Sequence, residues 1–282
     1  MRIGFIGAGK VGVSLGKYFL NHGIDVAGYC SRTLKSAKDA AEFTKTECFD
    51  SIGKIFDSSD VLFLTVTDSQ IESVWESLKD YDIHDKIFCH CSGAMTSAVF
   101  QKEGTKVSGY SIHPMYAFND RYTSYKGLDG IYFTVEGDAG NLAKMTGLVQ
   151  RLGNPYKVIK ADDKIRYHAA CVFVSNLVIG LYAKGAELLE QSGFEKEDAL
   201  KALMPLFMNN AANIEKFGPV NALTGPIERA DEITVKEHLQ VLDGNFDGIY
   251  RLLSEKLIEI ASQKNEQNDY EGIKKLIGEE KR

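Results

Sequence analysis

The sequence has little of what marks several large classes of protein. Its five cysteines form neither a disulfide framework nor a Cys-x-x-Cys metal pair, so we expect reduced thiols and no metal site. Acidic residues (39) outnumber basic ones (33), and the net charge of −6 argues against a nucleic-acid surface. No signal peptide precedes the first expected strand, and the longest apolar stretch, residues 169–183, is too short to cross a bilayer. We therefore expect a cytoplasmic protein with no membrane or nucleic-acid partner.

What is present describes a folded chain of two domains. The 282 residues are 44% hydrophobic and 26% charged, which is typical of a soluble globular protein. Strand and helix patterns alternate to about residue 160, and only helical patterns follow. The sequence predicts an α/β N-terminal Rossmann domain, residues 1–160, with a doubly wound and mostly parallel sheet. It predicts an all-α C-terminal domain, residues 161–282, which ends in a loosely held helix.

A glycine fingerprint follows the first expected strand, residues 3–6. Its residues are Gly7-Ala8-Gly9-Lys10-Val11-Gly12, and an amphipathic helical segment comes next. Gly7 permits a tight turn, Gly9 lets the backbone approach a pyrophosphate, and Gly12 allows close packing of helix on strand. The N–H groups that begin the helix would face the phosphates. This context predicts a dinucleotide site.

The tip of the second strand distinguishes between the two nicotinamide cofactors. It carries Ser31-Arg32-Thr33 and lacks the carboxylate that binds the ribose 2′-hydroxyl of NAD. Ser31 and Thr33 can hydrogen-bond a 2′-phosphate, and Arg32 can supply the charge. NADP is therefore the predicted cofactor, and an exposed loop arginine is the alternative interpretation. A further strand exit, Thr65-Val66-Thr67, is also expected beside the cofactor.

Two more strand exits carry candidate catalytic groups. His113 precedes Pro114 and has a pKa suited to proton transfer, although a His-Pro pair at a strand end is more often a structural turn. Ser92 can hold a substrate oxygen, or it can be a turn residue that caps the next helix, and spacing alone favours the cap. His90 is expected to pack inside the sheet.

The first helix of the second domain adds His168, Ser175 and Asn176. His168 and Ser175 are two turns apart and share a face. That face can line the nicotinamide end of the site or serve contacts between helices, and both interpretations stay open. Small residues along the same helix allow close helix packing, either within the chain or in a homodimer. Further on, Arg229 follows Gly225-Pro226 and can meet a substrate carboxylate or pair with Asp231 at a helix start.

Several of these motifs together resemble a known superfamily. They are Gly7 to Gly12, His90-Cys91-Ser92-Gly93-Ala94, Ser111-Ile112-His113-Pro114-Met115, His168 through Leu177, and Thr224-Gly225-Pro226 with Arg229 and Asp231. Over its whole length the chain resembles the 6-phosphogluconate, 3-hydroxyisobutyrate and pyrroline-5-carboxylate reductase type enzymes. It is more closely similar to a two-domain NADP oxidoreductase family. Pieces around His113 and His168 are also similar to prephenate dehydrogenase, which implies substrate roles for His113 and Ser92. The hydroxyacid relatives have a catalytic helix lysine, where this sequence offers Ser175 and Asn176.

The sequence thus predicts an NADP-dependent oxidoreductase that acts on a small polar metabolite in the cleft between the domains. His113 would be the acid/base, Ser92 would orient the reacting atom, and His168 and Asn176 would line the helical wall, with Ser175 and Arg229 at the substrate. Two alternatives are a non-catalytic NADP-binding sensor or scaffold, and a prephenate-dehydrogenase-like or imine reductase.

Overall fold

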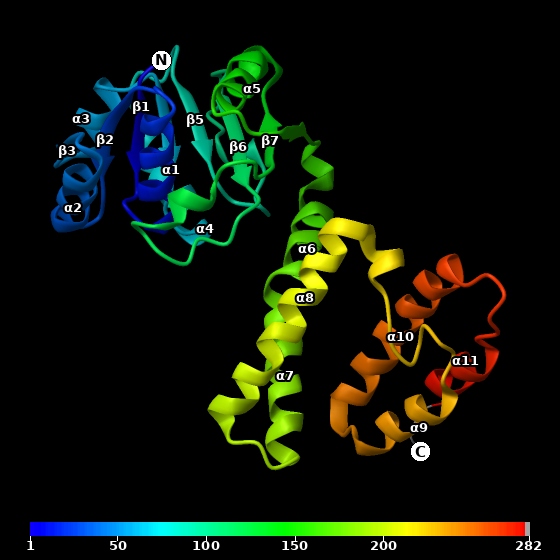
Figure 1. Cartoon of the computed structure of the whole chain (residues 1–282). Coiled ribbons are helices and arrows are strands. Elements are labelled where there is room, and N and C mark those ends of the chain that lie inside the picture. Colours follow the sequence, from blue (N-terminus) through cyan, green and yellow to red (C-terminus); the bar gives the residue numbers. More distant parts are fainter. Residues whose placement is uncertain (280–282) are drawn as a thin grey trace. The chain divides into compact units, whose positions relative to one another are not determined.

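One eight-stranded sheet organises the N-terminal part of the chain in a computed structural model that describes residues 1–279 (Figure 1). Its strand order is β3-β2-β1-β4-β5-β6-β7-β8, and every neighbouring pair is parallel except β6 and β7. The strands are β1 (Ile3–Ile6), β2 (Val26–Cys30), β3 (Glu47–Phe49), β4 (Val61–Leu64), β5 (Ile87–His90), β6 (Ser108–Pro114), β7 (Phe133–Gly137) and β8 (Tyr156–Val158). The chain order reverses between β1 and β4, which is the point where ligands bind in such sheets.

Helices cover both faces of this sheet. They are α1 (Lys10–Asn21), α2 (Leu34–Thr44), α3 (Ile52–Asp57), α4 (Asp68–Leu78) and α5 (Leu142–Arg151). Residues of α1, α2 and α5 share one buried cluster, and residues of α3 and α4 share the other. The predicted fold class, a doubly wound Rossmann sheet followed by helices, is confirmed.

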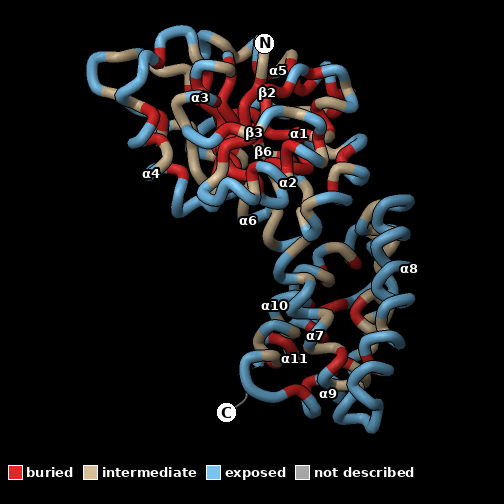
Figure 2. The backbone as a smooth tube through the Cα atoms, turned by 90° about the vertical axis from the view of Figure 1, so that its left-hand side faces the viewer, coloured by how far each residue is buried: buried red, intermediate tan, exposed pale blue. Residues whose placement is uncertain are grey.

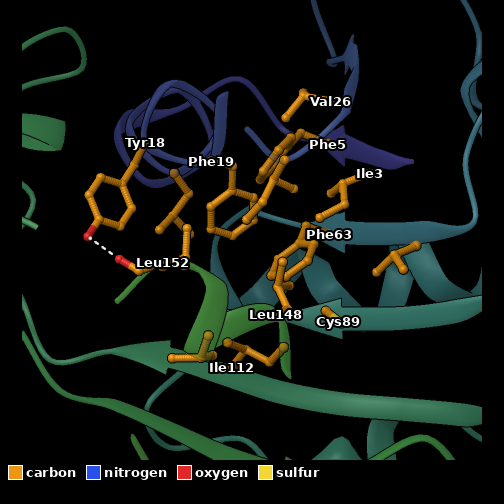
Figure 3. Close-up of a cluster of buried hydrophobic side chains, with 14 of the residues drawn as sticks. Ile3, Phe5, Tyr18, Phe19, Val26, Phe63, Cys89, Ile112, Leu148 and Leu152 are labelled. Atoms are coloured by element: carbon orange, nitrogen blue, oxygen red, sulfur yellow. Dashed lines mark hydrogen bonds between the residues drawn. The ribbon is translucent and has the colours of Figure 1, made fainter. Parts of the chain in front are cut away.

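Aromatic rings form the centre of the first cluster. Phe5, Phe19 and Phe63 are fully or almost fully buried and lie between the sheet and α1 (Figure 3). The ring centroids of Phe5 and Phe63 are 5.5 Å apart, and Phe19 meets Phe63 edge-on at 5.7 Å. Such pairs contribute beyond the burial of their area. This packing fixes α1, and with it the glycine turn, against the sheet.

Two elements of this part were not predicted from the sequence, and others differ in extent. The short β3 and α3 follow α2, where no strand or helix was expected. The last sheet residues of β6 are His113 and Pro114, so the predicted strand of residues 107–112 runs two residues further. His113 is therefore held by the sheet itself.

The remaining helices are α6 (Lys164–Val174), α7 (Asn176–Gln191), α8 (Lys196–Ala222), α9 (Glu232–Val241), α10 (Gly244–Lys264) and α11 (Glu271–Gly278). Contacts divide the chain into two compact units, residues 1–178 and 179–282, so α6 packs with the sheet. The predicted single helix over residues 164–190 is broken at Ser175, whose backbone leaves the helical region. In the second unit, α11 is not loosely held as predicted, because Tyr270, Ile273 and Ile277 are buried.

The helical stretch from residue 161 to 191 passes a length and hydropathy test for a membrane span, the one helix that does so among the described residues. An 18-residue window within it has a mean hydropathy of 1.5, and 6% of that window is buried. The break at Ser175 leaves α7 with 16 residues, or about 24 Å, against about 30 Å for a bilayer core. Lys164 at the start of the stretch is buried against the sheet. The test is therefore weak evidence for a membrane helix, and the apolar surface needs another cover.

Candidate cofactor and active site

The glycine fingerprint forms a turn whose shape depends on the absence of side chains. Gly7 has a φ of 112°, and a Cβ there would lie 2.7 Å from the Thr65 carbonyl. A Cβ on Gly12 would lie 2.4 Å from the Gly7 oxygen and from Thr65 Oγ1, which itself donates to Gly7 at 2.7 Å. A Cβ on Gly9 would meet no atom within 4 Å. The turn is closed on the strand side and open above Gly9, as close approach of a pyrophosphate requires.

A pocket of about 620 Å³ opens at this turn. Of the residues predicted to bind cofactor, eight line it: Gly7, Ala8, Gly9, Ser31, Arg32, Thr65, Val66 and Thr67. Its other wall was missed from the sequence and comes from the turn after β3, the start of α3, and α4: Asp50, Ser51, Ile52, Gln70, Ser73, Val74 and Ser77. Lys10, Val11 and Gly12 begin α1 behind the turn. The residues present fit a dinucleotide.

Of the residues predicted to bind the 2′-phosphate, Thr33 already makes hydrogen bonds within the protein. Thr33 is the N-cap of α2, accepting from Ser36 N at 3.3 Å and donating to Ser36 Oγ at 2.8 Å. Ser31 and Arg32 face the pocket. Asp50 brings a carboxylate to the same pocket, but it pairs with Lys54 at 2.8 Å, and this ion pair lowers the pKa of Asp50. The negative charge that would repel a phosphate is thereby partly neutralised.

Ser92 lies at the exit of β5 with all its hydrogen bonds made. Its hydroxyl donates to Asp68 Oδ2 at 2.6 Å and accepts from Ala94 N at 3.2 Å and Met95 N at 3.0 Å. A hydroxyl has one proton and two lone pairs, so this arrangement saturates it. Ser92 shapes the turn and anchors it to the start of α4, and it would have to release a partner to bind substrate.

His113 and His168 converge on the same turn. A Cβ added to Gly93 would lie 2.6 Å from His168 Nδ1 and 3.0 Å from His113 Nε2, so a side chain here would displace both rings. The two rings are edge to face, with centroids 6.5 Å apart. His168 Nδ1 is buried without a hydrogen-bond partner. Burial first, then the Lys164 cation and His168, lower the pKa of His113 to about 4, so its ring is neutral near pH 7.

His90 packs inside the sheet, where the sequence placed it. Its side chain is fully buried, with Nε2 3.2 Å from the Thr96 carbonyl oxygen and Nδ1 accepting from Ser92 N at 3.2 Å. Burial lowers its pKa to about 4. The ring supports the turn that carries Ser92 and Gly93.

Lys164 is the main residue of the site that the sequence did not reveal. Its ammonium is fully buried and donates to the Ser92 carbonyl at 2.8 Å and to Ser111 Oγ at 2.5 Å. Burial lowers its pKa to about 8, although Glu136, Cys91 and Asp68 act in the opposite direction. A helix lysine is therefore present, about three turns before Ser175 and one turn before His168. That four-residue spacing on one helix face was the available signal.

The remaining predicted site residues are Ser175, Asn176 and Arg229. Ser175 Oγ donates to the Cys171 carbonyl at 2.7 Å and lies 3.0 Å from Asn176 Oδ1, so both bonds stay within the helix. Arg229 is exposed in the helical unit. Asp231 caps α9 by accepting from Thr234 N at 3.1 Å, and Arg229 contributes to the lowered pKa of that carboxylate. The structure brings together His113, His168 and the Ser92 turn, and gives Ser175 and Asn176 no hydrogen bond to them; Arg229 belongs to the other unit.

Comparison with known proteins defines the class. Residues 2–92 match the family described as NADP oxidoreductase coenzyme F420-dependent, and residues 131–257 match a domain of unknown function, DUF2520. The chain thus joins an NADP oxidoreductase domain to a DUF2520 helical domain, which confirms the predicted resemblance. No curated protein matches the sequence.

Solved structures share the fold of this chain. A Bacteroides fragilis protein described as an NADP oxidoreductase is similar at 22% identity, with 92% of this chain and 98% of that chain covered and a TM-score of 0.72. A Thermotoga maritima protein is 25% identical, with 93% and 99% covered and a TM-score of 0.72. Pyrroline carboxylate reductase of Plasmodium falciparum, solved with NADP bound, is 14% identical, with 99% and 98% covered and a TM-score of 0.58. At the level of the family, NADP as cofactor is confirmed, and the family match indicates an NADP oxidoreductase.

The buried ammonium predicts a pH dependence of stability. Unfolded Lys164 keeps its proton up to the ordinary pKa of 10.5, whereas the folded protein releases it near 8. Between these values the folded state binds fewer protons, so the contribution of Lys164 to the free energy of unfolding rises with pH. Urea unfolding is measured at pH values below this window and within it. The free energy of unfolding of wild type minus that of Lys164→Met should increase as pH rises. The exposed Lys157→Met is the control, and its free energy of unfolding should differ from that of wild type by the same amount at every pH. If Lys164→Met also differed from wild type by a constant amount, the buried charge would be contradicted.

Proposed function

We propose that this chain is an NADP-dependent oxidoreductase that transfers a hydride between NADP(H) and a small polar metabolite. The observation that carries the proposal is a neutral histidine, His113, at the end of β6, on the sheet edge that also holds the open glycine turn. Cofactor turn, Ser92 turn and His113 follow β1, β5 and β6, whose carboxyl ends share this edge.

The cofactor would lie in the pocket at the glycine turn. The pyrophosphate would meet the backbone above Gly9 and the N-terminus of α1, and the 2′-phosphate would meet Arg32 and Ser31. Bound NADPH supplies the hydride. Thr65 holds the turn through its bond to Gly7, and Val66 and Thr67 continue the pocket wall along the exit of β4.

The role of Arg32 is tested by comparing NADPH with NADH. Arg32→Ala should weaken NADPH binding by about tenfold to a hundredfold, because a charge-assisted bond to a phosphate contributes roughly 1.5–3 kcal/mol. NADH has no 2′-phosphate, so its affinity should change little. Calorimetric titration of both cofactors measures this, with the neighbouring exposed Lys35→Ala as the control. Equal weakening of both cofactors would remove Arg32 from the phosphate site.

His113 would exchange the proton that accompanies the hydride. Its ring is neutral because burial and the Lys164 cation disfavour imidazolium, and Nε2 lies at the Gly93 turn. His168 from α6 would form the facing wall, and Ser92 would hold the turn in place. Asn176, Ser175 and Arg229 are kept as predicted substrate contacts.

Turnover and cofactor binding should separate in a His113 variant. His113→Ala removes the proton-transfer group but leaves the glycine turn intact, so NADPH binding should persist and turnover should be lost. NADPH consumption with a panel of oxo-acids, imino-acids and aldehydes measures turnover. Wild-type binding of NADPH without turnover on any member would favour the alternative, a non-catalytic NADP sensor. Unchanged activity of the variant would remove His113 from the chemistry.

We also propose that a second copy of the chain covers the apolar surface of α7 and α8. The two helices pack on each other through Tyr182 and Phe207, yet α8 is exposed along nearly its whole length (Figure 2). Its exposed apolar side chains include Met204, Leu206, Phe207, Met208, Ile214 and Phe217. So large an apolar surface on one element is typical of an interface between subunits. A twin chain is the proposed occupant because the same exposed helix surface on two copies can associate by twofold symmetry.

The mass in solution tests this interface. Wild type should sediment as a dimer, and Leu206→Glu should shift it to monomer because an unpaired carboxylate would be buried at the seam. Gln263→Glu adds the same charge on exposed α10 and should remain dimeric. A monomeric wild type at micromolar concentration would contradict the proposal, as would wild-type binding to neutral lipid vesicles.

A further inference from the structure

One contact at the site is not explained by the predicted roles. Tyr167, on α6 between Lys164 and His168, places its hydroxyl 2.6 Å from His113 Nδ1. The two rings meet edge to face, with centroids 5.6 Å apart. The contact is short, directional and partly buried, and it engages the ring nitrogen that faces away from the Gly93 turn.

A bond of this length needs one proton between the two atoms, and the chemistry decides which atom supplies it. A phenol is a good donor and a weak acceptor, whereas the unprotonated nitrogen of imidazole is a good acceptor. Burial raises the pKa of Tyr167 above its ordinary value, so the phenol keeps its proton. The Cys171 thiol near the phenol is only a weak acceptor. The Tyr167 proton therefore has its best acceptor in His113 Nδ1.

We propose that Tyr167 is a positioning residue that holds neutral His113 as the tautomer with its proton on Nε2. A neutral imidazole has one protonated and one bare nitrogen, and the partner of one nitrogen sets the state of the other. With Nδ1 accepting from Tyr167, Nε2 presents an N–H at the Gly93 turn. His113 then begins the reaction as a hydrogen-bond donor.

This tautomer limits the class of substrate, given the proposed function. A donor at Nε2 needs a lone pair on the reacting group, so it suits a carbonyl oxygen or a neutral imine nitrogen and not a protonated iminium. As hydride adds to carbon, the π pair moves to the oxygen or nitrogen, which takes the Nε2 proton. The Tyr167 proton moves to Nδ1 in the same step. Afterwards it returns from Nδ1 to the phenolate as Nε2 takes a proton from solvent, which restores the starting tautomer. The chain is thereby arranged for reduction.

The groups around His113 are consistent with a neutral ring. Lys164 and His168 face it from α6, Asp68 from α4 and His90 from β5. Only the carboxylate of Asp68 favours imidazolium among these four, and that carboxylate accepts the Ser92 proton at 2.6 Å. Burial and the Lys164 cation outweigh it, so Tyr167 acts on the tautomer of a ring that is already uncharged.

Nitrogen NMR of the full-length protein labelled with ¹⁵N-histidine tests the proposal without a substrate. Near neutral pH, wild-type His113, assigned through the signals lost in His113→Gln, should show a protonated Nε2 and a bare Nδ1. Any other wild-type pattern overturns the proposal. In Tyr167→Phe both nitrogens should move toward values averaged over the two tautomers. Tyr125→Phe removes a phenol that packs on Phe43 and should leave the His113 signals unchanged. An unaltered tautomer in Tyr167→Phe overturns the assigned role.

An acid titration of the same samples gives an independent readout. Donation by Tyr167 to Nδ1 stabilises the uncharged ring, so Tyr167→Phe should raise the pKa of His113 from its wild-type value of about 4. If Nδ1–H were the donor, the variant would leave this pKa unchanged or lower it, and the proposal would fail. Both readouts concern the His113 ring alone. Absence of NADPH turnover would therefore contradict the proposed function, whereas the tautomer would still be decided by the NMR measurements.

Discussion

The arrangement of the site depends on one buried ammonium group. Lys164 stands at the first residue of α6 and donates to the Ser92 carbonyl after β5 and to Ser111 on β6. These two bonds tie the start of the helix to two neighbouring strands. Tyr167 and His168 follow within one turn, so the same constraint brings their rings to His113. Desolvating a charge is costly, and a fold keeps such a group where its bonds define geometry.

The ammonium also contributes to the electrostatics around it. Burial is the main reason that the pKa values of His90 and His113 are low, and the Lys164 cation lowers both further, so the two rings stay neutral near pH 7. A neutral ring has two distinct nitrogens, and its chemistry then depends on which one carries the proton. The bond from Tyr167 becomes important for that reason: in an imidazolium both nitrogens would be donors and the phenol would have nothing to select.

What the sequence revealed follows the range of the interactions involved. The glycine turn, the strand exits and the alternation of elements are local patterns, and the structure reproduces them with small changes of extent. The short β3 and α3 were missed because three- and six-residue elements have too few positions for a periodic pattern. Missing these two elements mattered, because Asp50 and Ser51 of that segment line the cofactor pocket. Lys164 was missed because its partners lie 72 and 53 residues away.

The apolar helices show a second limit of what the sequence can predict. The periodic apolar residues after position 164 predicted a face that packs on something, but a stripe along a helix carries no record of its partner. The break at Ser175 divides that stripe into a part fixed to the sheet by Lys164 and a part that packs on α8. α7 alone is shorter than a bilayer core, and α8 stays exposed on most of its surface. The remaining apolar area is therefore suited to contact with another protein surface. The extent of this area along α8 is the reason that we propose a second copy of the chain as its partner.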